Sequence, residues 1–185
     1  MFESPIARHR AFFAILPPLA LARRIVSAAS WFDGDGRSLR PEHLHVTIAI
    51  LDDVGALTPS LAATLKSVGD AVRAAPFEMV FDLAVGSARS VALRPRLKNR
   101  PAAALHDRIA AVLRAAGLAE RADYRFASHM TLGYRSGAPF TQDIAPIGWT
   151  ADAFVLVHSH VGKTRHEILG RWTLDGMEDR QLTLF

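Results

Sequence analysis

The chain has 185 residues, with 22 Lys and Arg against 18 Asp and Glu, and half of its residues are hydrophobic. This composition excludes a disordered or a fibrous chain and leaves a globular protein with enough residues for a real core. Because cysteine is absent, the chemistry of any site must come from His, acids, hydroxyls or Arg. The excess of four positive charges permits an anionic partner, but it is too small for a protein that binds duplex DNA.

The first predicted element is a buried strand over 10–16, followed by a helix that begins at Pro17 and ends near Ala29. The apolar run over 11–22 also has features of a secretory signal, but Pro17 and Pro18 interrupt it in the middle. No other apolar stretch approaches the roughly 20 residues that span a bilayer. We therefore expect a cytoplasmic protein that does not interact with membranes.

The rest of the chain alternates between short strands and helices. In chain order we expect a loop at 33–36, a strand at 43–51, a helix at 60–75 capped by Thr58, strands at 77–85 and 90–94, a helix that begins at Asn99 and ends at Gly117, and strands at 129–134, 149–160 and 166–174. This mixture predicts an α+β fold. We expect a single domain that spans residues 1–185.

One interval in the sequence occurs twice. Pro17 opens a predicted helix 28 positions before His45, and Pro101 opens another 28 positions before His129. A duplicated strand–helix–loop–strand unit would explain this interval, and chance would explain it equally well. If the unit is duplicated, His45 and His129 are corresponding residues.

Both of these histidines begin the same pattern in a predicted strand, His-Val-Thr-Ile at 45–48 and His-Met-Thr-Leu at 129–132. Side chains two positions apart on a strand share a face, so each His lies beside a Thr while the apolar residues face the other way. An imidazole pair can take a proton from water and give one to a leaving oxygen, and hydroxyls can donate to phosphoryl oxygens. Two such strands in contact would suit metal-free cleavage of a phosphoester. A single His-x-Thr in a strand is more often structural.

These motifs and their flanking segments resemble the two-histidine phosphoesterases, and among them the RNA 2′,3′-cyclic phosphodiesterases, which are also described as 2′-5′ RNA ligases. The similar segments lie at 10–17, 40–48, 128–132 and 165–174, and the resemblance covers most of the chain. It implies a bilobal fold in which two antiparallel sheets face each other across a central cleft. The helices would lie outside, and a pseudo-twofold duplication would place one motif in each lobe.

The same resemblance implies an activity, which is hydrolysis of 2′,3′-cyclic phosphate ends of RNA, or of small cyclic nucleotides, to 2′-phosphates without a metal or cofactor. RNA ligation would be the reverse reaction. By this analogy His45 is the proton donor to the departing 3′ oxygen and His129 the acceptor that activates water, while Thr47 and Thr131 hold the phosphoryl oxygens. The competing interpretation is a non-catalytic module that binds RNA ends or nucleotides. We expect a monomer in either case.

Four further residues are candidate substrate contacts. Many relatives carry Arg five residues after the second His, where this chain has Tyr134, and Arg135 follows it. Strict alternation would put Arg135 on the face of His129 and Tyr134 on the opposite face, although either could serve the substrate. Tyr124 and Phe126, in the loop before the second motif, are candidate aromatic contacts for a base.

The remaining histidines give weaker signals. His158 and His160, taken together with His43 and His45, could suggest zinc, but no Asp or Glu stands at a ligand-like spacing. We therefore expect no metal site. His9, His106 and His166 are interpreted as surface or locally satisfied residues.

Overall fold

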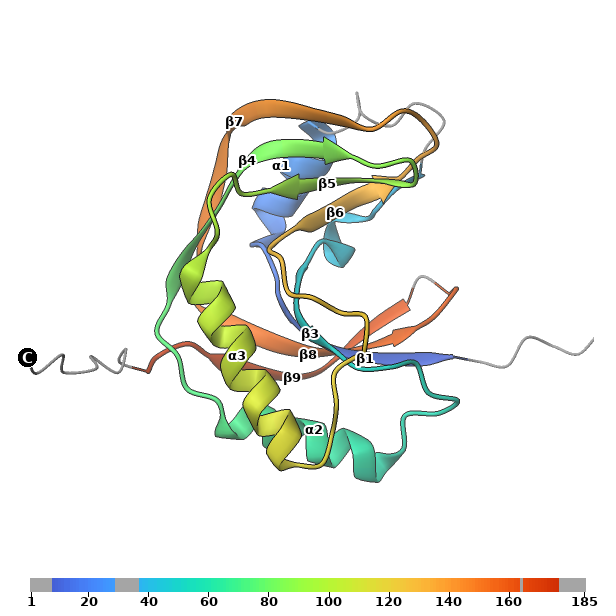
Figure 1. Cartoon of the computed structure of the whole chain (residues 1–185), viewed down its shortest axis with the longest axis vertical. Coiled ribbons are helices and arrows are strands. Elements are labelled where there is room, and N and C mark those ends of the chain that lie inside the picture. The colour runs from blue at the N-terminus through green and yellow to red at the C-terminus, as the bar shows by residue number, and fades with distance from the viewer. Residues whose placement is uncertain (1–7, 29–36, 164, 177–185) are drawn as a thin grey trace, which may run out of the picture.

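A computed structural model of the chain describes residues 8–28, 37–163 and 165–176. Figure 1 shows this part of the chain as two sheets with helices packed on their outer faces. The strands are β1 (His9–Ile15), β2 (Arg37–Ser38), β3 (Val46–Ile50), β4 (Phe77–Gly86), β5 (Ser90–Arg94), β6 (Met130–Tyr134), β7 (Phe140–Ala151), β8 (Ala153–His160) and β9 (Arg165–Thr173). The α-helices are α1 (Leu19–Ala28), α2 (Pro59–Ala71) and α3 (Arg100–Ala115), and a 3₁₀ turn covers Pro41–His43.

Both sheets are antiparallel, which confirms the predicted α+β class. The strand order is β3-β1-β8-β9 in the first sheet and β2-β6-β5-β4-β7 in the second. β3 and β6, the strands that follow the two motif histidines, contact each other where the sheets approach. Helices α2 and α3 contact the first sheet, and among the described helices none is both long and apolar enough to cross a membrane.

The two motif strands pair with their neighbours in the same register, which confirms the duplication. Ala14 of β1 lies opposite Thr47 of β3, and Ala92 of β5 lies opposite Thr131 of β6. In each pair a bulge follows the Thr, so that the fourth residue of each motif is an extra residue in its strand. The units β1–α1–β3 and β5–α3–β6 therefore correspond, motif to motif.

Side-chain caps begin two of the helices as the sequence predicts. The Oγ1 of Thr58 accepts a hydrogen bond from the Leu61 N–H (3.2 Å), and the Oδ1 of Asn99 accepts one from the Ala102 N–H (2.9 Å). Gly117 follows α3 with a positive φ of 73°, the conformation that glycine adopts most easily. Helix α2 ends at Ala71, earlier than predicted, because the chain is already extended at its C-cap residue.

The predicted strand at 149–160 is wrong at its start, because residues 140–151 form a separate strand, β7. Trp149 lies near the end of β7 and does not begin β8. β7 is an edge strand that pairs only with β4, and its register is irregular around Pro146. An edge strand tolerates proline and polar residues because one side of it needs no ladder bonds, so the pattern of a buried strand is missing.

The strand of the first motif is also shorter than the predicted strand at 43–51. Because Pro41–His43 form a 3₁₀ turn, β3 begins only at Val46, directly after His45. The two-residue strand β2 pairs with β6, so the chain passes from the second sheet to the first just before the motif. The predicted loop at 33–36 lies outside the described residues.

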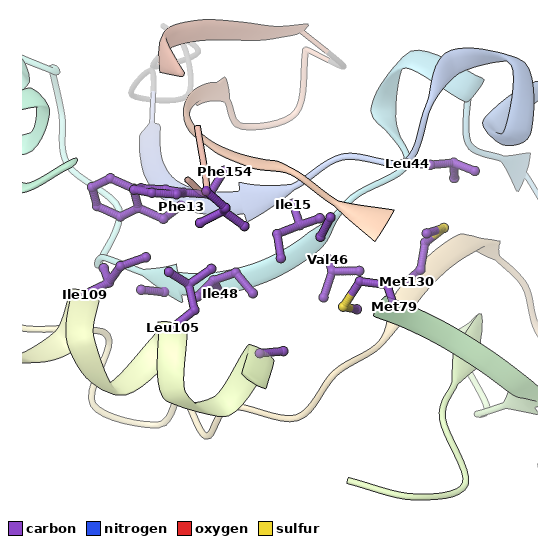
Figure 2. Close-up of a cluster of buried hydrophobic side chains, with 14 of the residues drawn as sticks. Phe13, Ile15, Leu44, Val46, Ile48, Met79, Leu105, Ile109, Met130 and Phe154 are labelled. Atoms are coloured by element: carbon purple, nitrogen blue, oxygen red, sulfur yellow. The ribbon is translucent and has the colours of Figure 1, made fainter. Parts of the chain in front are cut away.

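One continuous core connects the two sheets. Figure 2 shows Leu105 and Ile109 of α3 pointing toward Ile48 on β3, with Val46 farther along the strand toward Met130 of β6. All five side chains are fully buried and belong to one apolar cluster. The strands that carry the two motifs are therefore held against each other by shared packing, which keeps the motif histidines in a defined relative position.

Candidate active site

The first motif histidine is held by the backbone. The Nδ1–H of His45 donates to the carbonyl oxygen of His43 at 2.7 Å. This bond places the proton of the neutral ring on Nδ1 and leaves the Nε2 lone pair available for proton transfer. The ring of Phe12 lies beside it, with 4.9 Å between the ring centroids.

The second motif histidine is held in the same way. The Nδ1–H of His129 donates to the carbonyl oxygen of Ala127 at 2.8 Å. In both motifs the acceptor is therefore the carbonyl two residues before the histidine. The two halves of the duplication therefore share a strand register, and they hold His45 and His129 by the same backbone hydrogen bond.

A cavity of about 420 Å³ lies beside the first motif and has the size of a small-ligand site. His45 and Thr47 line it from the first sheet, and Tyr134 lines it from the second. Its other lining residues are Arg10, Phe12, Leu39, His43, Ile50, Ser159, His160, Val161, Gly162 and His166. His129 and Thr131 are not among them, but His129 is close enough to His45 for its positive charge to lower the pKa of His45.

The bulges decide which later residues face this cavity. Along the first motif and β3 the lining residues are His45, Thr47 and then Ile50, because the bulge adds one residue after the Thr. The equivalent bulge on β6 makes Tyr134 the counterpart of Ile50, and Tyr134 lines the cavity. The bulge puts Tyr134 on the face of Thr131, so the prediction from strict alternation that Arg135 shares this face is wrong.

Arg135 lies instead at the turn between β6 and β7. Its Nη1 donates to the carbonyl oxygen of Ala138 at 3.1 Å, and its guanidinium carbon lies 5.3 Å from the centre of the Phe140 ring. A guanidinium in this position stabilises the turn through a hydrogen bond and a cation–π contact. Tyr134, by contrast, is 57% exposed and lines the cavity.

The two aromatic candidates before the second motif pack against the protein. The Tyr124 hydroxyl donates to the carbonyl oxygens of Thr47 (3.0 Å) and Ile48 (3.1 Å), and burial raises its pKa. Phe126 stacks on the ring of His106 with 5.1 Å between centroids. Neither residue lines the cavity with His45, and Tyr124 instead joins the loop before the second motif to the strand of the first.

The electrostatics around His45 favour neutral imidazoles. Burial lowers the pKa of His45, its hydrogen bond to His43 opposes this shift, and the charges of His129 and His43 lower the pKa further. Burial, together with the charges of His45 and His43, lowers the pKa of His166 to about 4. His166, interpreted from the sequence as a surface or locally satisfied residue, lies beside the first motif, with its ring centroid 5.7 Å from that of His45.

Sequence reasoning missed Phe12 and His166 as neighbours of the first motif. Phe12 and Phe13 are adjacent on β1, so their side chains point to opposite faces, Phe13 into the core and Phe12 toward His45. Strand alternation could therefore have identified Phe12. His166 lies near His45 because of the order of the strands in the first sheet. The residues around His166 do not predict this strand order.

Comparison with known proteins identifies the family. A family model described as the 2′-5′ RNA ligase superfamily matches residues 17–163. The chain belongs to this superfamily. Curated proteins give no significant match to the sequence.

Solved structures share the fold of this chain. E. coli LigT complexed with 3′-AMP has 24% identity and a TM-score of 0.74, with 90% of this chain and 98% of LigT covered. TT0787 of Thermus thermophilus has 21% identity and a TM-score of 0.69, covering 90% and 98%. The MHV ns2 PDE domain has 18% identity and a TM-score of 0.51, covering 76% and 99%. At these identities the likeness shows a shared LigT-like fold.

Proposed function

We propose that this member of the 2′-5′ RNA ligase superfamily is a metal-independent phosphodiesterase, which hydrolyses 2′,3′-cyclic phosphate ends of RNA, or small cyclic nucleotides, to 2′-phosphates. The observation that carries the proposal is the matched pair of Nδ1–H bonds, from His45 to His43 and from His129 to Ala127. Each bond engages Nδ1 and so leaves the Nε2 of that ring to exchange a proton with the substrate. LigT, the structural neighbour, is crystallised with 3′-AMP and with phosphate, which supports a phosphate-bearing nucleotide as the ligand.

The proposed reaction needs one proton acceptor and one proton donor. The Nε2 of His129 takes a proton from a water molecule as the water oxygen bonds to phosphorus. The bond between phosphorus and the 3′ oxygen breaks, and the Nε2 of His45 gives its proton to that oxygen. The products are a 2′-phosphate and a 3′ hydroxyl. The hydroxyls of Thr47 and Thr131 donate hydrogen bonds to the phosphoryl oxygens.

His45 must be protonated to act as the donor, and its lowered pKa makes it neutral near pH 7 in the free protein. A phosphate anion in the cavity would favour the charged imidazole. We therefore propose that the substrate brings the active site to its working protonation state, with a proton taken up at His45. The binding of a 2′-nucleotide product should show the same proton uptake.

The experiment that tests these roles changes the leaving atom. A substrate with sulfur in place of the 3′ oxygen has a leaving group that needs no proton, so it makes a general acid unnecessary. We expect this substrate to restore turnover to a His45→Ala variant and to leave His129→Ala slow. Chromatography of the product from the natural cyclic phosphate should show the 2′-phosphate.

Two other results would change the proposed roles of His45 and His129 or the proposed activity. Rescue of His129→Ala, and not of His45→Ala, would mean that the donor and acceptor roles are exchanged. Tight binding of a 2′-nucleotide, with no hydrolysis of any cyclic phosphate in a panel of nucleotides and RNA oligomers, would contradict the enzyme and support the non-catalytic binding module.

A further inference from the structure

Three histidines that the proposed reaction does not use lie together at one end of the first sheet. His9 on β1 is the cross-strand partner of His160 on β8, and His158 lies two residues before His160. His9 Nδ1 and His158 Nε2 are 2.7 Å apart. One ring nitrogen from each of the three histidines lies within 4.8 Å of the other two. The sequence suggests His43 and His45 as the neighbours of His158 and His160, whereas the structure places His9 beside them.

The spacing of these nitrogens fits a bound metal ion. Zinc binds imidazole nitrogen at about 2.0–2.1 Å in a tetrahedral arrangement, so two ligand nitrogens on one ion are about 3.3 Å apart. The distance between His9 Nδ1 and His158 Nε2, at 2.7 Å, is shorter than this value, and the 4.8 Å limit for the three nitrogens is longer. Small rotations of the three rings would therefore bring all of them to ligand distance.

A carboxylate lies beside the three histidines. Glu167 on β9 is the cross-strand partner of His158. Its carboxylate oxygens lie 3.7 Å from the Nδ1 of His158 and 3.2 Å from the Nε2 of His160. Metal-bound histidines usually donate their second ring N–H to a carboxylate or carbonyl. The two ring nitrogens of His158 face different neighbours, Nε2 toward His9 and Nδ1 toward Glu167. Arg165 also pairs with Glu167, at 2.5 Å, and balances its charge.

Most of the cluster lies on the face of the sheet opposite the cavity. Phe12 and Val157 belong to the apolar group on the cavity face, and strand alternation puts His9 and His158 on the other face. His160, at the end of β8, also borders the cavity. An ion bound to these histidines would join the ends of β1 and β8, with Glu167 of β9 beside them, without contact with the Nε2 atoms of the motif histidines.

We propose that His9, His158 and His160 bind one divalent transition-metal ion of the zinc class, with Glu167 positioning the imidazoles. Three imidazoles select zinc and similar ions over magnesium, which prefers oxygen ligands. The ion stabilises the end of the first sheet, and the proposed hydrolysis proceeds without it. This site is independent of the proposed function, so either can fail alone.

The test measures metal binding by the full-length chain after treatment with a chelator. Calorimetric titration with ZnCl₂ is expected to show one site, and titration with MgCl₂ none. Zinc at about 100 times its Kd should raise Tm by roughly 5–10 °C, because the ion binds only the folded state. Cobalt(II) in the same site should give the intense visible absorption of a tetrahedral complex.

Variants locate the site. His9→Gln and His160→Gln should each abolish the single zinc site, and Glu167→Gln should weaken it by about 10–100-fold. His106→Gln, which changes a half-buried histidine on α3, is the matched control and should bind zinc like the wild type. Circular dichroism confirms that each variant is folded. The proposal is overturned if wild-type protein shows no saturable zinc binding, or if zinc binds His9→Gln and His160→Gln as tightly as it binds the wild type.

Discussion

Alanine in place of His45 or His129 is expected to lower kcat for a 2′,3′-cyclic nucleotide by about 10²–10⁴-fold. Each variant removes one of the two Nε2 atoms that the backbone bonds to His43 and Ala127 hold in place. The imidazoles act in one step, so the double variant should be little slower than the slower single variant. Steady-state hydrolysis near neutral pH, with circular dichroism to confirm folding, measures these rates.

The matched control for this experiment is His106→Ala. His106 lies on α3 and pairs with Asp107 and Glu120, away from the cavity beside His45. Its replacement should leave kcat unchanged, which separates a loss of chemistry from the loss of any histidine. Wild-type turnover by either single motif variant would contradict the two-histidine mechanism.

Replacing Asp53 by Asn is expected to lower the free energy of unfolding at pH 7 by about 3 kcal/mol. The Asp53 side chain is only 8% exposed, and it accepts from Arg8 (2.6 Å), Arg10 (2.6 Å) and Arg121 (2.7 Å). These arginines come from the start of β1 and from the loop that leads to the second motif. The substitution would leave three guanidinium groups facing one another without their anion.

The stability lost in Asp53→Asn should become smaller as the pH falls. The bond from Arg10 contributes most to holding the pKa of Asp53 well below its usual range, with further contributions from Arg8 and Arg121. Because this pKa is lower in the folded state than the usual unfolded value near 3.9, the stabilisation is complete above that value and is lost as the pH falls below it. The difference between wild type and Asp53→Asn should therefore narrow below about pH 4. Urea unfolding at several pH values measures it.

The neighbouring Asp52→Asn variant is the control. The Asp52 side chain is 74% exposed and contacts Arg121 at 3.4 Å. Exposed pairs of this kind contribute about 1 kcal/mol or less. Equal stability of the two variants at pH 7, or a gap that stays constant down to low pH, would show that Asp53 does not stabilise this junction.

Local signals were sufficient for most of the elements. The caps at Thr58 and Asn99 and the helix end at Gly117 depend on residues within one turn, and the structure confirms them. The two motifs were recognised because each places a polar pair on an otherwise apolar strand. The 28-residue interval left the duplication and chance equally open, and the matching strand register of the two units decides for the duplication.

Other features depend on pairing between strands, which the sequence does not encode locally. The bulge after each motif Thr exchanges the faces of Tyr134 and Arg135, and nothing within β6 alone reveals it. The edge strand β7 was missed because Pro146 and its polar neighbours do not resemble a buried strand. The group of His9, His158 and His160 requires β1 to lie beside β8, a neighbour distant in the chain.

The central claim is that the imidazoles of His45 and His129 serve one substrate site. Long-range ¹H–¹⁵N spectra of the histidine side chains, recorded during titration with a 2′-nucleotide, test it most directly. We expect the Nε2 resonances of both histidines to shift along one binding curve, with both free rings protonated on Nδ1 and His106 unmoved. A shift of only one motif histidine, or of neither while the nucleotide binds, would contradict the shared site.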